Sequence, residues 1–225
     1  MKSKTAKKML KKVVEDYDNL SKDFDQTRQY SWKEFKGFLP YIRDNDHLID
    51  IGCGNGRFYK FITKNKKISY LGIDNSEKLL EKAREQNPQA KFITGSFLEL
   101  PVDKNIADDI VAIASLHHVP GKDFRLKAIQ ELYRILKPNG ILIISVWNLF
   151  QPRYKKYIWR ARLRHILSLG SYDSRDTMIP WGKTGIKRYY YAFTQQELRE
   201  LLEQNGFKTI KEEIGNNFVF ICQKS

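Results

Sequence analysis

The sequence predicts an α/β protein built on a mostly parallel β-sheet that is covered by helices. From His47 onward, short apolar runs alternate with amphipathic helical patterns, which is the order of elements expected for such a sheet. A glycine-rich turn joins the first apolar run to the first helical pattern. Two last apolar runs flank the pair Gly215-Asn216, so we expect an antiparallel hairpin at the edge of the sheet.

Five parallel strands are expected before that hairpin. The fifth, Ile141–Trp147, is almost purely apolar, which is typical of a strand buried on both faces. The carboxyl ends of parallel strands meet at one edge of the sheet, and a ligand crevice is expected there. The other four strands are His47–Ile51, Ile68–Ile73, Lys91–Thr94 and Asp109–Ala114.

Capping residues and helix breakers set the bounds of the expected helices. Ser76 and Thr194 each precede a helical pattern, and their side chains can accept a hydrogen bond from a free backbone amide. Lys137-Pro138-Asn139-Gly140 ends the longest pattern. The expected helices are Arg57–Thr63, Glu77–Gln86, Lys122–Leu136 and Gln195–Gln204, and the closing strands are Phe207–Ile214 and Asn217–Gln223.

Length and composition fit one sizeable core. The chain has 225 residues, of which 41% are hydrophobic, and a domain of that size buries about 70% of its unfolded surface. No apolar run approaches the roughly 20 residues of a membrane helix, and residues 1–12 lack the apolar stretch of a secretory signal. We therefore expect a cytoplasmic protein. Cys53 and Cys222 give neither a disulfide framework nor a zinc spacing, so no metal site is expected.

Two segments concentrate the positive charge. The formal net charge is +14; residues 1–12 hold six lysines and no acid, and residues 151–190 hold ten Lys or Arg against two acids. This excess favours nucleic acid or an anionic membrane surface, although a merely basic soluble surface has the same charge. We expect an N-terminal basic helical extension over residues 1–45 that caps the substrate side, and a main domain over residues 46–225 with a basic aromatic insertion at 148–193.

The glycine turn has the pattern Asp50-x-Gly52-x-Gly54-x-Gly56. Glycines there permit a sharp turn and a close approach of the ligand. A dinucleotide site would have G-x-G-x-x-G, but Arg57 occupies the third glycine position of that pattern. Asp74 ends the second strand, where a carboxylate can accept both hydroxyls of a ribose. Asp50 would repel a pyrophosphate and suits a ligand with an ammonium and a sulfonium group.

The glycine loop, together with Asp74 at the end of the second strand, resembles the class I S-adenosylmethionine-dependent methyltransferases, and this resemblance extends over roughly residues 45–225. The resemblance implies a Rossmann-like fold with a seven-stranded, mostly parallel sheet and a C-terminal antiparallel hairpin. It also implies S-adenosyl-L-methionine as the cofactor. Many members have Asp where this chain has Ser96, whose hydroxyl can still form a hydrogen bond with adenine. The implied cofactor-binding residues are Asp50, Gly52, Cys53, Gly54, Gly56, Asp74, Asn75, Ser76, Ser96, Phe97, Ala114 and Ser115.

Further segments are similar to the tRNA wobble-uridine methyltransferases. They are Phe24–Trp32, Leu116–His118, Val146–Gln151 and Lys187–Thr194. Those enzymes esterify the carboxylate of 5-carboxymethyluridine, and their fungal and animal members work with a small zinc-binding activator subunit. The resemblance therefore implies tRNA as a partner, together with such an activator. This chain departs from the family at Asn148–Gln151, where members often carry Ala-x-Glu-Gln, and its insertion is shorter than in many relatives.

A carboxylate substrate needs no general base, because its pKa near 4 leaves it ionised at neutral pH. Holding nucleophile, methyl and sulfur in line can supply about 7–11 kcal/mol of the barrier. We therefore expect Arg28 and Arg188 to grip the carboxylate or a phosphate, unless they are solvated surface arginines. Stacking on a flipped-out base is expected from Trp32, Trp147 and Tyr189, and core packing is the alternative for Trp147. The expected catalytic set is Arg28, His117, His118, Trp147 and Arg188.

Two other functions fit the same residues. One is a methyltransferase of a small molecule, such as a quinone precursor or a free acid, and it would need a closed apolar pocket. The other is a non-catalytic RNA-binding or partner-activating module that keeps the fold, against which the intact loop and Asp74 argue. Residues 153–165 mix Lys and Arg with aromatic side chains, which suits RNA and also an amphipathic helix on a membrane surface.

Overall fold

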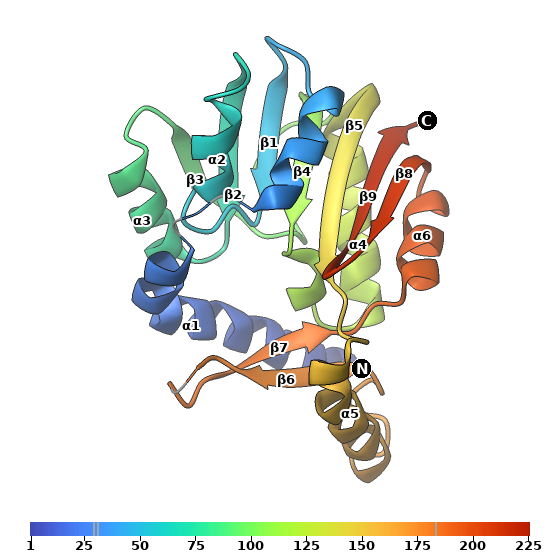
Figure 1. Cartoon of the computed structure of the whole chain (residues 1–225). Helices are drawn as coiled ribbons and strands as arrows, with labels where there is room; N and C mark the ends of the chain where they lie inside the picture. The colour runs from blue at the N-terminus through green and yellow to red at the C-terminus, as the bar shows by residue number, and fades with distance from the viewer. Residues whose placement is uncertain (29, 31, 183) are drawn as a thin grey trace.

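A computed structural model describes residues 1–28, 30, 32–182 and 184–225. These residues form a seven-stranded sheet with the strand order β3-β2-β1-β4-β5-β9-β8, in which only β9 runs against its neighbours. The strands are β1 (His47–Ile51), β2 (Ser69–Asp74), β3 (Lys91–Thr94), β4 (Ala107–Ile113), β5 (Leu136–Trp147), β8 (Phe207–Ile214) and β9 (Asn217–Lys224). The predicted α/β fold with its closing hairpin is confirmed, and Figure 1 shows the arrangement.

The helices also follow the sequence signals. Ser76 caps α3 by accepting the Leu79 amide at 3.3 Å, and Thr194 caps α6 by accepting the Glu197 amide at 3.1 Å. The helices are α1 (Ser3–Thr27), α2 (Arg57–Ile62), α3 (Glu77–Gln86), α4 (Lys122–Ile135), α5 (Lys155–Leu167) and α6 (Gln195–Glu203), with 3-10 turns η1 (Lys33–Tyr41), η2 (Leu116–His118) and η3 (Pro152–Tyr154).

β5 begins earlier than the sequence suggested. The predicted strand starts at Ile141, whereas the observed one starts at Leu136, directly after α4. Leu136 pairs with Ala107, and the register shifts before Asp109 pairs with Ile141. The helix-breaking residues Lys137-Pro138-Asn139-Gly140 therefore lie in the irregular first part of β5 and not in a loop.

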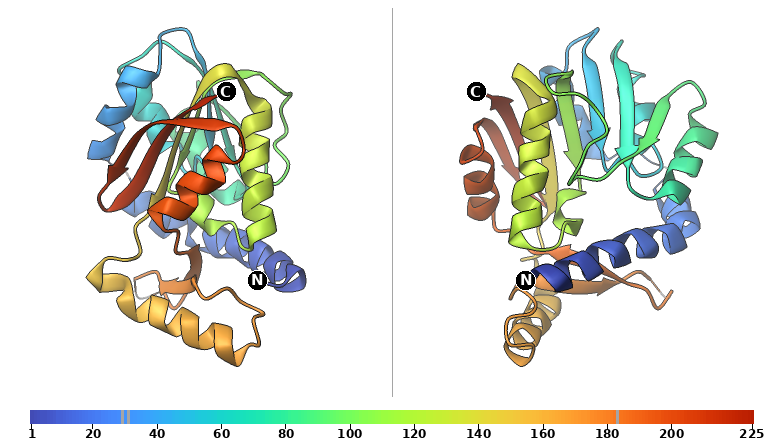
Figure 2. Two further views of the ribbon diagram at one scale, coloured as in Figure 1. Left: turned by 90° about the vertical axis from the view of Figure 1, so that its right-hand side faces the viewer. Right: turned by 180° about the vertical axis from the view of Figure 1, so that it is seen from behind.

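Two apolar cores flank the sheet. The alternation of strand side chains sends Leu48 to one face and Ile49 to the other. One face packs against α4 and α6, and the opposite face packs against η1, α2 and α3 (Figure 2). Both faces of the central strands are thus buried, which explains their nearly continuous apolar sequences.

α1 and a second small sheet lie across one end of the main sheet (Figures 1 and 2). The small sheet is an antiparallel hairpin of β6 (Asp176–Pro180) and β7 (Lys187–Tyr191). α1 packs against α3 and β7 and buries Met9 and Val13 in the main core. Residues 148–193, the expected basic aromatic insertion, form η3, α5 and this hairpin.

α5 lies beyond the hairpin, and only one side of it packs against the rest of the protein (Figure 1). Ile158 and Ala161 face the protein, whereas Trp159, Leu163, Ile166 and Leu167 are 41–74% exposed. Across the described part of the chain, no helix is long and apolar enough to cross a membrane.

Candidate active site

A pocket opens where the carboxyl ends of β1, β2 and β4 meet α1 and β7. The glycine loop forms its floor, and all three glycines have positive φ values of 56–75°. A Cβ on Gly52 would lie 2.4 Å from the Ser115 Cβ, so this position accepts only glycine. A Cβ on Gly54 would come within 3.3 Å of the Phe24 ring, which places α1 directly over the loop.

Four of the five backbone amides from Gly52 to Gly56 are already hydrogen-bonded within the protein. The Gly52 and Cys53 amides donate to the Ile73 carbonyl at 2.7 and 3.2 Å, and the Gly54 amide donates to Asp74 Oδ2 at 2.8 Å. A pyrophosphate site needs free amides that point at the ligand. The loop therefore lacks the amide cradle of a dinucleotide site.

Two buried carboxylates face the same pocket. Asp50 is 2% exposed and accepts the Tyr70 hydroxyl at 2.7 Å. Burial raises the pKa of Asp50 to about 7, although the Tyr70 hydrogen bond lowers it in part. Asp74 accepts the Gly54 and Ser76 amides, one on each oxygen. The Asn75 amide also interacts with this carboxylate. A carboxylate has about four lone-pair sites, so Asp74 can still accept a ligand hydroxyl.

One wall of the pocket, formed by residues at the carboxyl ends of β3 and β4, is apolar. Phe97, Leu98 and Ile113 line it beside Ser96 and Ser115. The Ser96 hydroxyl accepts the Leu98 amide at 3.1 Å, and the Ser115 hydroxyl donates to the Ile51 carbonyl at 3.1 Å. Such a wall suits the flat face of a purine.

Arg188 supplies positive charge to the other half of the pocket. Its side chain is 4% exposed, and its Nη1 donates to the Tyr17 hydroxyl at 3.1 Å. The guanidinium lies 4.1 Å from the Trp181 ring centroid. Among the described residues it forms no ion pair, and its Nε has no hydrogen-bond partner. A buried cation without a counter-ion is costly, so this arrangement fits an anionic ligand.

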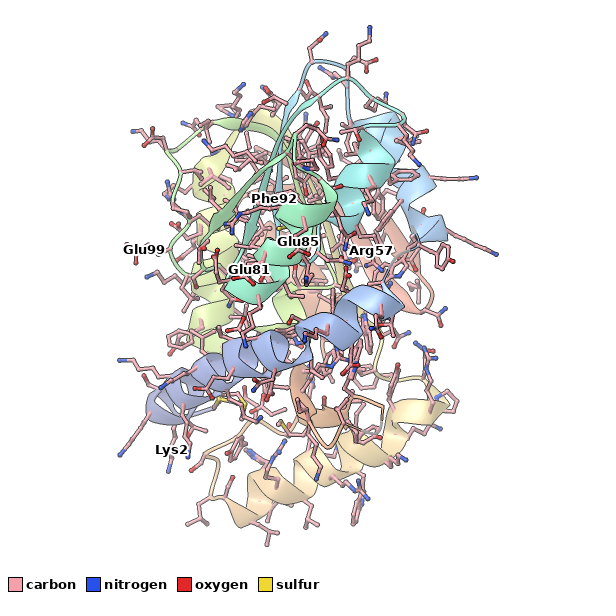
Figure 3. The ribbon with its side chains drawn as sticks, turned by 90° about the vertical axis from the view of Figure 1, so that its left-hand side faces the viewer. Lys2, Arg57, Glu81, Glu85, Phe92 and Glu99 are labelled. Atoms are coloured by element: carbon pink, nitrogen blue, oxygen red, sulfur yellow. The ribbon has the colours of Figure 1, made fainter. Side chains whose placement is uncertain are left out.

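Two more arginines line the pocket. Arg28 packs its guanidinium 5.1 Å from the Trp181 ring, and burial together with Arg188 lowers its pKa. Arg57 stacks 4.2 Å from the Trp32 ring, and burial together with Arg28 lowers its pKa to about 10. The pocket therefore combines two carboxylates, Asp50 and Asp74, with three arginines (Figure 3 shows Arg57 near the C-terminal end of α1).

Burial disfavours the charged form of the two pocket histidines, His117 and His118. His117 is 1% exposed, and its Nδ1 accepts the Trp147 amide at 3.2 Å. Burial holds the pKa of His117 well below its usual range, and burial together with Arg188 lowers that of His118 to about 3. Trp147 stacks on Tyr190 with ring centroids 5.0 Å apart. We therefore do not expect His117 or His118 to act as a general base at neutral pH.

Most residues expected at the site line this pocket. Those that do are Arg28, Trp32, Asp50, Gly52, Cys53, Gly54, Asp74, Asn75, Ser96, Phe97, Ala114, Ser115, His117, His118, Trp147 and Arg188. Gly56 and Ser76 do not: Gly56 is the N-cap of α2, where a Cβ would meet Asn87 and Phe92, and the Ser76 hydroxyl donates to Asp18 at 2.6 Å.

The expectation for Tyr189 is wrong. Its ring is 1% exposed in the main core, and its hydroxyl donates to Asp176 at 2.7 Å, so it cannot stack on a base. The pocket also contains residues that were not predicted from the sequence. They are Leu10, Val13 and Tyr17 from α1, and Arg57, which was not assigned to the site. The α1 residues follow helical spacing, which is the signal that could have found them.

Comparisons with known proteins agree with this geometry. Residues 49–144 match the family described as a methyltransferase domain. A putative methyltransferase of Encephalitozoon cuniculi, ECU09_1500, is 30% identical over 196 residues, which cover 86% of either chain. The chain belongs to the S-adenosylmethionine-dependent methyltransferases.

Solved structures support the fold of this methyltransferase. A protein of Methanosarcina mazei, described as a SAM-dependent methyltransferase, superposes with a TM-score of 0.72 at 23% identity, over 82% of this chain and 95% of that one. A putative methyltransferase of Haloferax volcanii, solved in complex with the Trm112 methyltransferase activator, superposes with a TM-score of 0.67 at 17% identity, over 94% and 96% of the two chains.

Some relatives of the methyltransferase have names that specify a substrate. The mouse tRNA (carboxymethyluridine(34)-5-O)-methyltransferase ALKBH8 is 34% identical over 156 residues, and this match covers 68% of the present chain. The match covers only 23% of the mouse protein's own length. The Schizosaccharomyces pombe protein of the same enzyme name is 28% identical, over 86% and 87% of the two chains.

The pocket of the methyltransferase fits its cofactor, S-adenosylmethionine. Two buried carboxylates suit a ligand that carries a sulfonium and an ammonium group, and the occupied loop amides disfavour a phosphate. Asp74 can still accept a ribose hydroxyl, and Phe97 with Ile113 gives an apolar wall for adenine. When bound, the cofactor supplies an electrophilic methyl group.

Proposed function

We propose that this chain methylates the carboxylate of a modified wobble uridine of the 5-carboxymethyluridine type in tRNA. The observation on which the proposal rests is Arg188, a buried guanidinium that has no counter-ion among the described residues and lines the same pocket as Asp50 and Asp74. A planar carboxylate matches the fork of a guanidinium. The names of the mouse and fission-yeast relatives point to the same substrate.

The proposed reaction needs orientation more than proton transfer. A carboxylate is ionised at neutral pH and is itself the nucleophile. Arg188 would hold it by one oxygen while the other oxygen faces the methyl group, and Arg28 would bind the same anion or a neighbouring phosphate. His117 and His118 stay neutral and are not required as bases.

Exclusion of water and stacking would come from the aromatic residues around the arginines. Phe24 stacks on Trp181 at 6.1 Å, and Trp147 stacks on Tyr190. We propose that Trp32 and Trp147, which line the pocket, stack on the substrate base. In a site closed by α1, the electrostatic contacts of Arg188 are stronger than they would be in water.

The outer face of α1 would bind the tRNA backbone. Its inner face lines the pocket with Leu10, Val13 and Tyr17, and its exposed lysines point the other way. These lysines are Lys2, Lys4, Lys7, Lys8, Lys11 and Lys22. Figure 3 shows α1 with Lys2 at its start. Exposed lysines suit phosphates, and α1, which carries them, lines the pocket into which a base would be flipped.

We also propose that a small zinc-binding activator protein binds this chain. The Haloferax neighbour was solved with the Trm112 activator, and the two methyltransferase folds superpose over nearly their whole lengths. Co-expression with such an activator should raise the yield of soluble protein or the turnover. Equal yield and turnover with and without the activator would refute this part of the proposal.

The test is methyl transfer to defined tRNA. Purified protein, with activator where required, is incubated with labelled S-adenosylmethionine and tRNA that carries 5-carboxymethyluridine. We expect label in the methyl ester, released by mild alkali, and none in the same tRNA with unmodified uridine. Transfer to free carboxylic acids but not to tRNA would replace the proposal with a small-molecule function.

A further inference from the structure

A chain of hydrogen bonds connects Arg188 to His118 through Tyr17. Arg188 Nη1 donates to the Tyr17 hydroxyl oxygen at 3.1 Å. The Tyr17 hydroxyl lies 2.6 Å from His118 Nε2. His118 Nδ1 lies 2.7 Å from the Tyr189 carbonyl oxygen. The chain thus starts at the arginine, passes through α1 and ends on the backbone of β7.

The hydrogen-bond partners indicate which atom carries the proton at each step of this chain of hydrogen bonds. The Tyr189 carbonyl can only accept, so His118 Nδ1 carries the proton. Neutral His118 has one proton, and its Nε2 must therefore accept from the Tyr17 hydroxyl. The hydroxyl oxygen remains free to accept from Arg188. Next to it, His117 has the opposite tautomer, because its Nδ1 accepts the Trp147 amide.

This arrangement leaves His118 without a ring nitrogen for a substrate. Both its nitrogens are occupied, and any effect on the reaction has to pass through Tyr17. Tyr17 in turn holds one nitrogen of Arg188, while Trp181 lies 4.1 Å from the guanidinium. The guanidinium is thus held by one hydrogen bond and by surrounding aromatic rings, of which Trp181 lies nearest, and its Nε has no hydrogen-bond partner in the described residues.

We propose that Tyr17 and His118 are positioning residues that orient Arg188 for its anionic substrate. The inference rests on the proposed function in one respect, the identity of that anion. Because Tyr17 belongs to α1 and Arg188 to β7, the same bond ties the helix that covers the pocket to the residue that would bind the substrate. His118 is then assigned a supporting role instead of contact with the reacting atoms.

The first test does not depend on activity. Long-range proton–nitrogen NMR of the full chain reports the tautomer of each histidine and the rotation of each guanidinium. We expect the proton of His118 on Nδ1, that of His117 on Nε2, and a hindered Arg188 guanidinium. Tyr17→Phe should shift the His118 Nε2 resonance and release the rotation of Arg188, and the matched control Tyr133→Phe should do neither. A His118 proton on Nε2, or an Arg188 signal unchanged in Tyr17→Phe, would overturn the proposal.

The second test separates positioning from a merely structural role. Tyr17→Phe should raise the KM for carboxymethyluridine tRNA about tenfold, the effect of one lost hydrogen bond to a charged group. S-adenosylmethionine affinity and kcat should stay within about twofold. His118→Asn should raise KM similarly, and the double variant should be no worse than either single one. Additive effects of the two substitutions, or a loss in kcat alone, would contradict the proposed chain of hydrogen bonds. A wild-type protein that does not methylate this tRNA would remove the tRNA assignment. The NMR result would still decide whether Tyr17 and His118 position Arg188.

Discussion

The carboxylate of Asp74 accepts the Gly54 amide at 2.8 Å, so the acid at the end of β2 also fixes the loop at the end of β1. One hydrogen bond thus joins the two sequence features from which a cofactor site was expected. The acid that would bind the ribose and the loop over which the methionine part would lie are held in one rigid unit. Its second oxygen accepts the Ser76 amide at the start of α3.

Replacement of Asp74 by Ala should weaken S-adenosylmethionine binding by a factor of about 10 to 100. The estimate corresponds to the net loss of about one hydrogen bond to a charged group, which contributes about 1.5–3 kcal/mol. Isothermal titration calorimetry measures the affinity. Asp108→Asn, which removes an ion pair to Lys137 away from the pocket, is the control and should bind normally.

Affinity for S-adenosylmethionine should rise with pH up to about 7. Burial raises the pKa of Asp50 to about 7, so below that pH its carboxyl is protonated and neutral. Only the ionised form attracts a cationic ligand, and the gain approaches a factor of about ten per pH unit well below the pKa. Titration from pH 5.5 to 7.5 should show this rise, and Asp50→Asn should flatten it. An equal slope in both proteins would refute this role of Asp50.

Local signals predicted the main sheet but not the hairpin that completes the site. Most strands of the main sheet are apolar runs, whereas β7, Lys187–Tyr191, is basic and aromatic. Had residues 187–191 been interpreted as a strand, the two-residue alternation would have put Arg188 and Tyr190 on one face and Tyr189 on the other. That alternation is what the two cores show.

The roles of the α1 residues could not follow from sequence alone. Tyr17 meets Arg188 across 171 positions of the chain, and no local pattern encodes such a contact. The helical stripe of Leu10, Val13 and Tyr17 indicates a buried face, but not which surface it covers. By contrast, Asp50 and Asp74 were predictable because the strand ends that hold them are neighbours in the sheet.

Arg188→Gln should raise the KM for tRNA strongly while leaving S-adenosylmethionine affinity within about twofold. The variant keeps a hydrogen-bonding group but removes the charge, which costs about 1.5–3 kcal/mol of substrate binding, or about 10- to 150-fold. Steady-state kinetics with each substrate varied in turn separates the two effects. Arg43→Gln, at an exposed position between η1 and β1, is the matched control. A normal KM in Arg188→Gln would refute the anion-binding role.

Binding of tRNA should weaken steeply with salt, and α1 should account for part of the slope. Each phosphate contact contributes roughly 0.7–0.9 to the slope of log affinity against log salt. Changing Lys7, Lys8 and Lys11 together to Gln should lower the slope by about two. The same change at Lys64, Lys67 and Lys208, which are exposed on other elements, should leave it unchanged. Filter binding at several salt concentrations gives both slopes.

Stability should fall as pH rises from about 4 to 8 because of Asp109. Burial and a hydrogen bond with Asp46 raise its pKa to about 8, so the native carboxyl stays protonated where the unfolded one, with a pKa near 3.9, ionises. The free energy of unfolding then decreases by up to about 1.4 kcal/mol per pH unit in that window and levels off above it. Asp109→Asn should flatten the curve in urea unfolding, and Asp103→Asn, at an exposed position, should not.

Mass spectrometry of tRNA nucleosides from cells with and without this protein tests the substrate most directly. Loss of the protein should abolish the methyl ester of the wobble uridine and leave the free carboxymethyl nucleoside in its place, and a copy with Asp74→Ala and Arg188→Gln should fail to restore the ester. Identical levels of the ester with and without the protein, in cells that contain no second enzyme for it, would contradict the assignment.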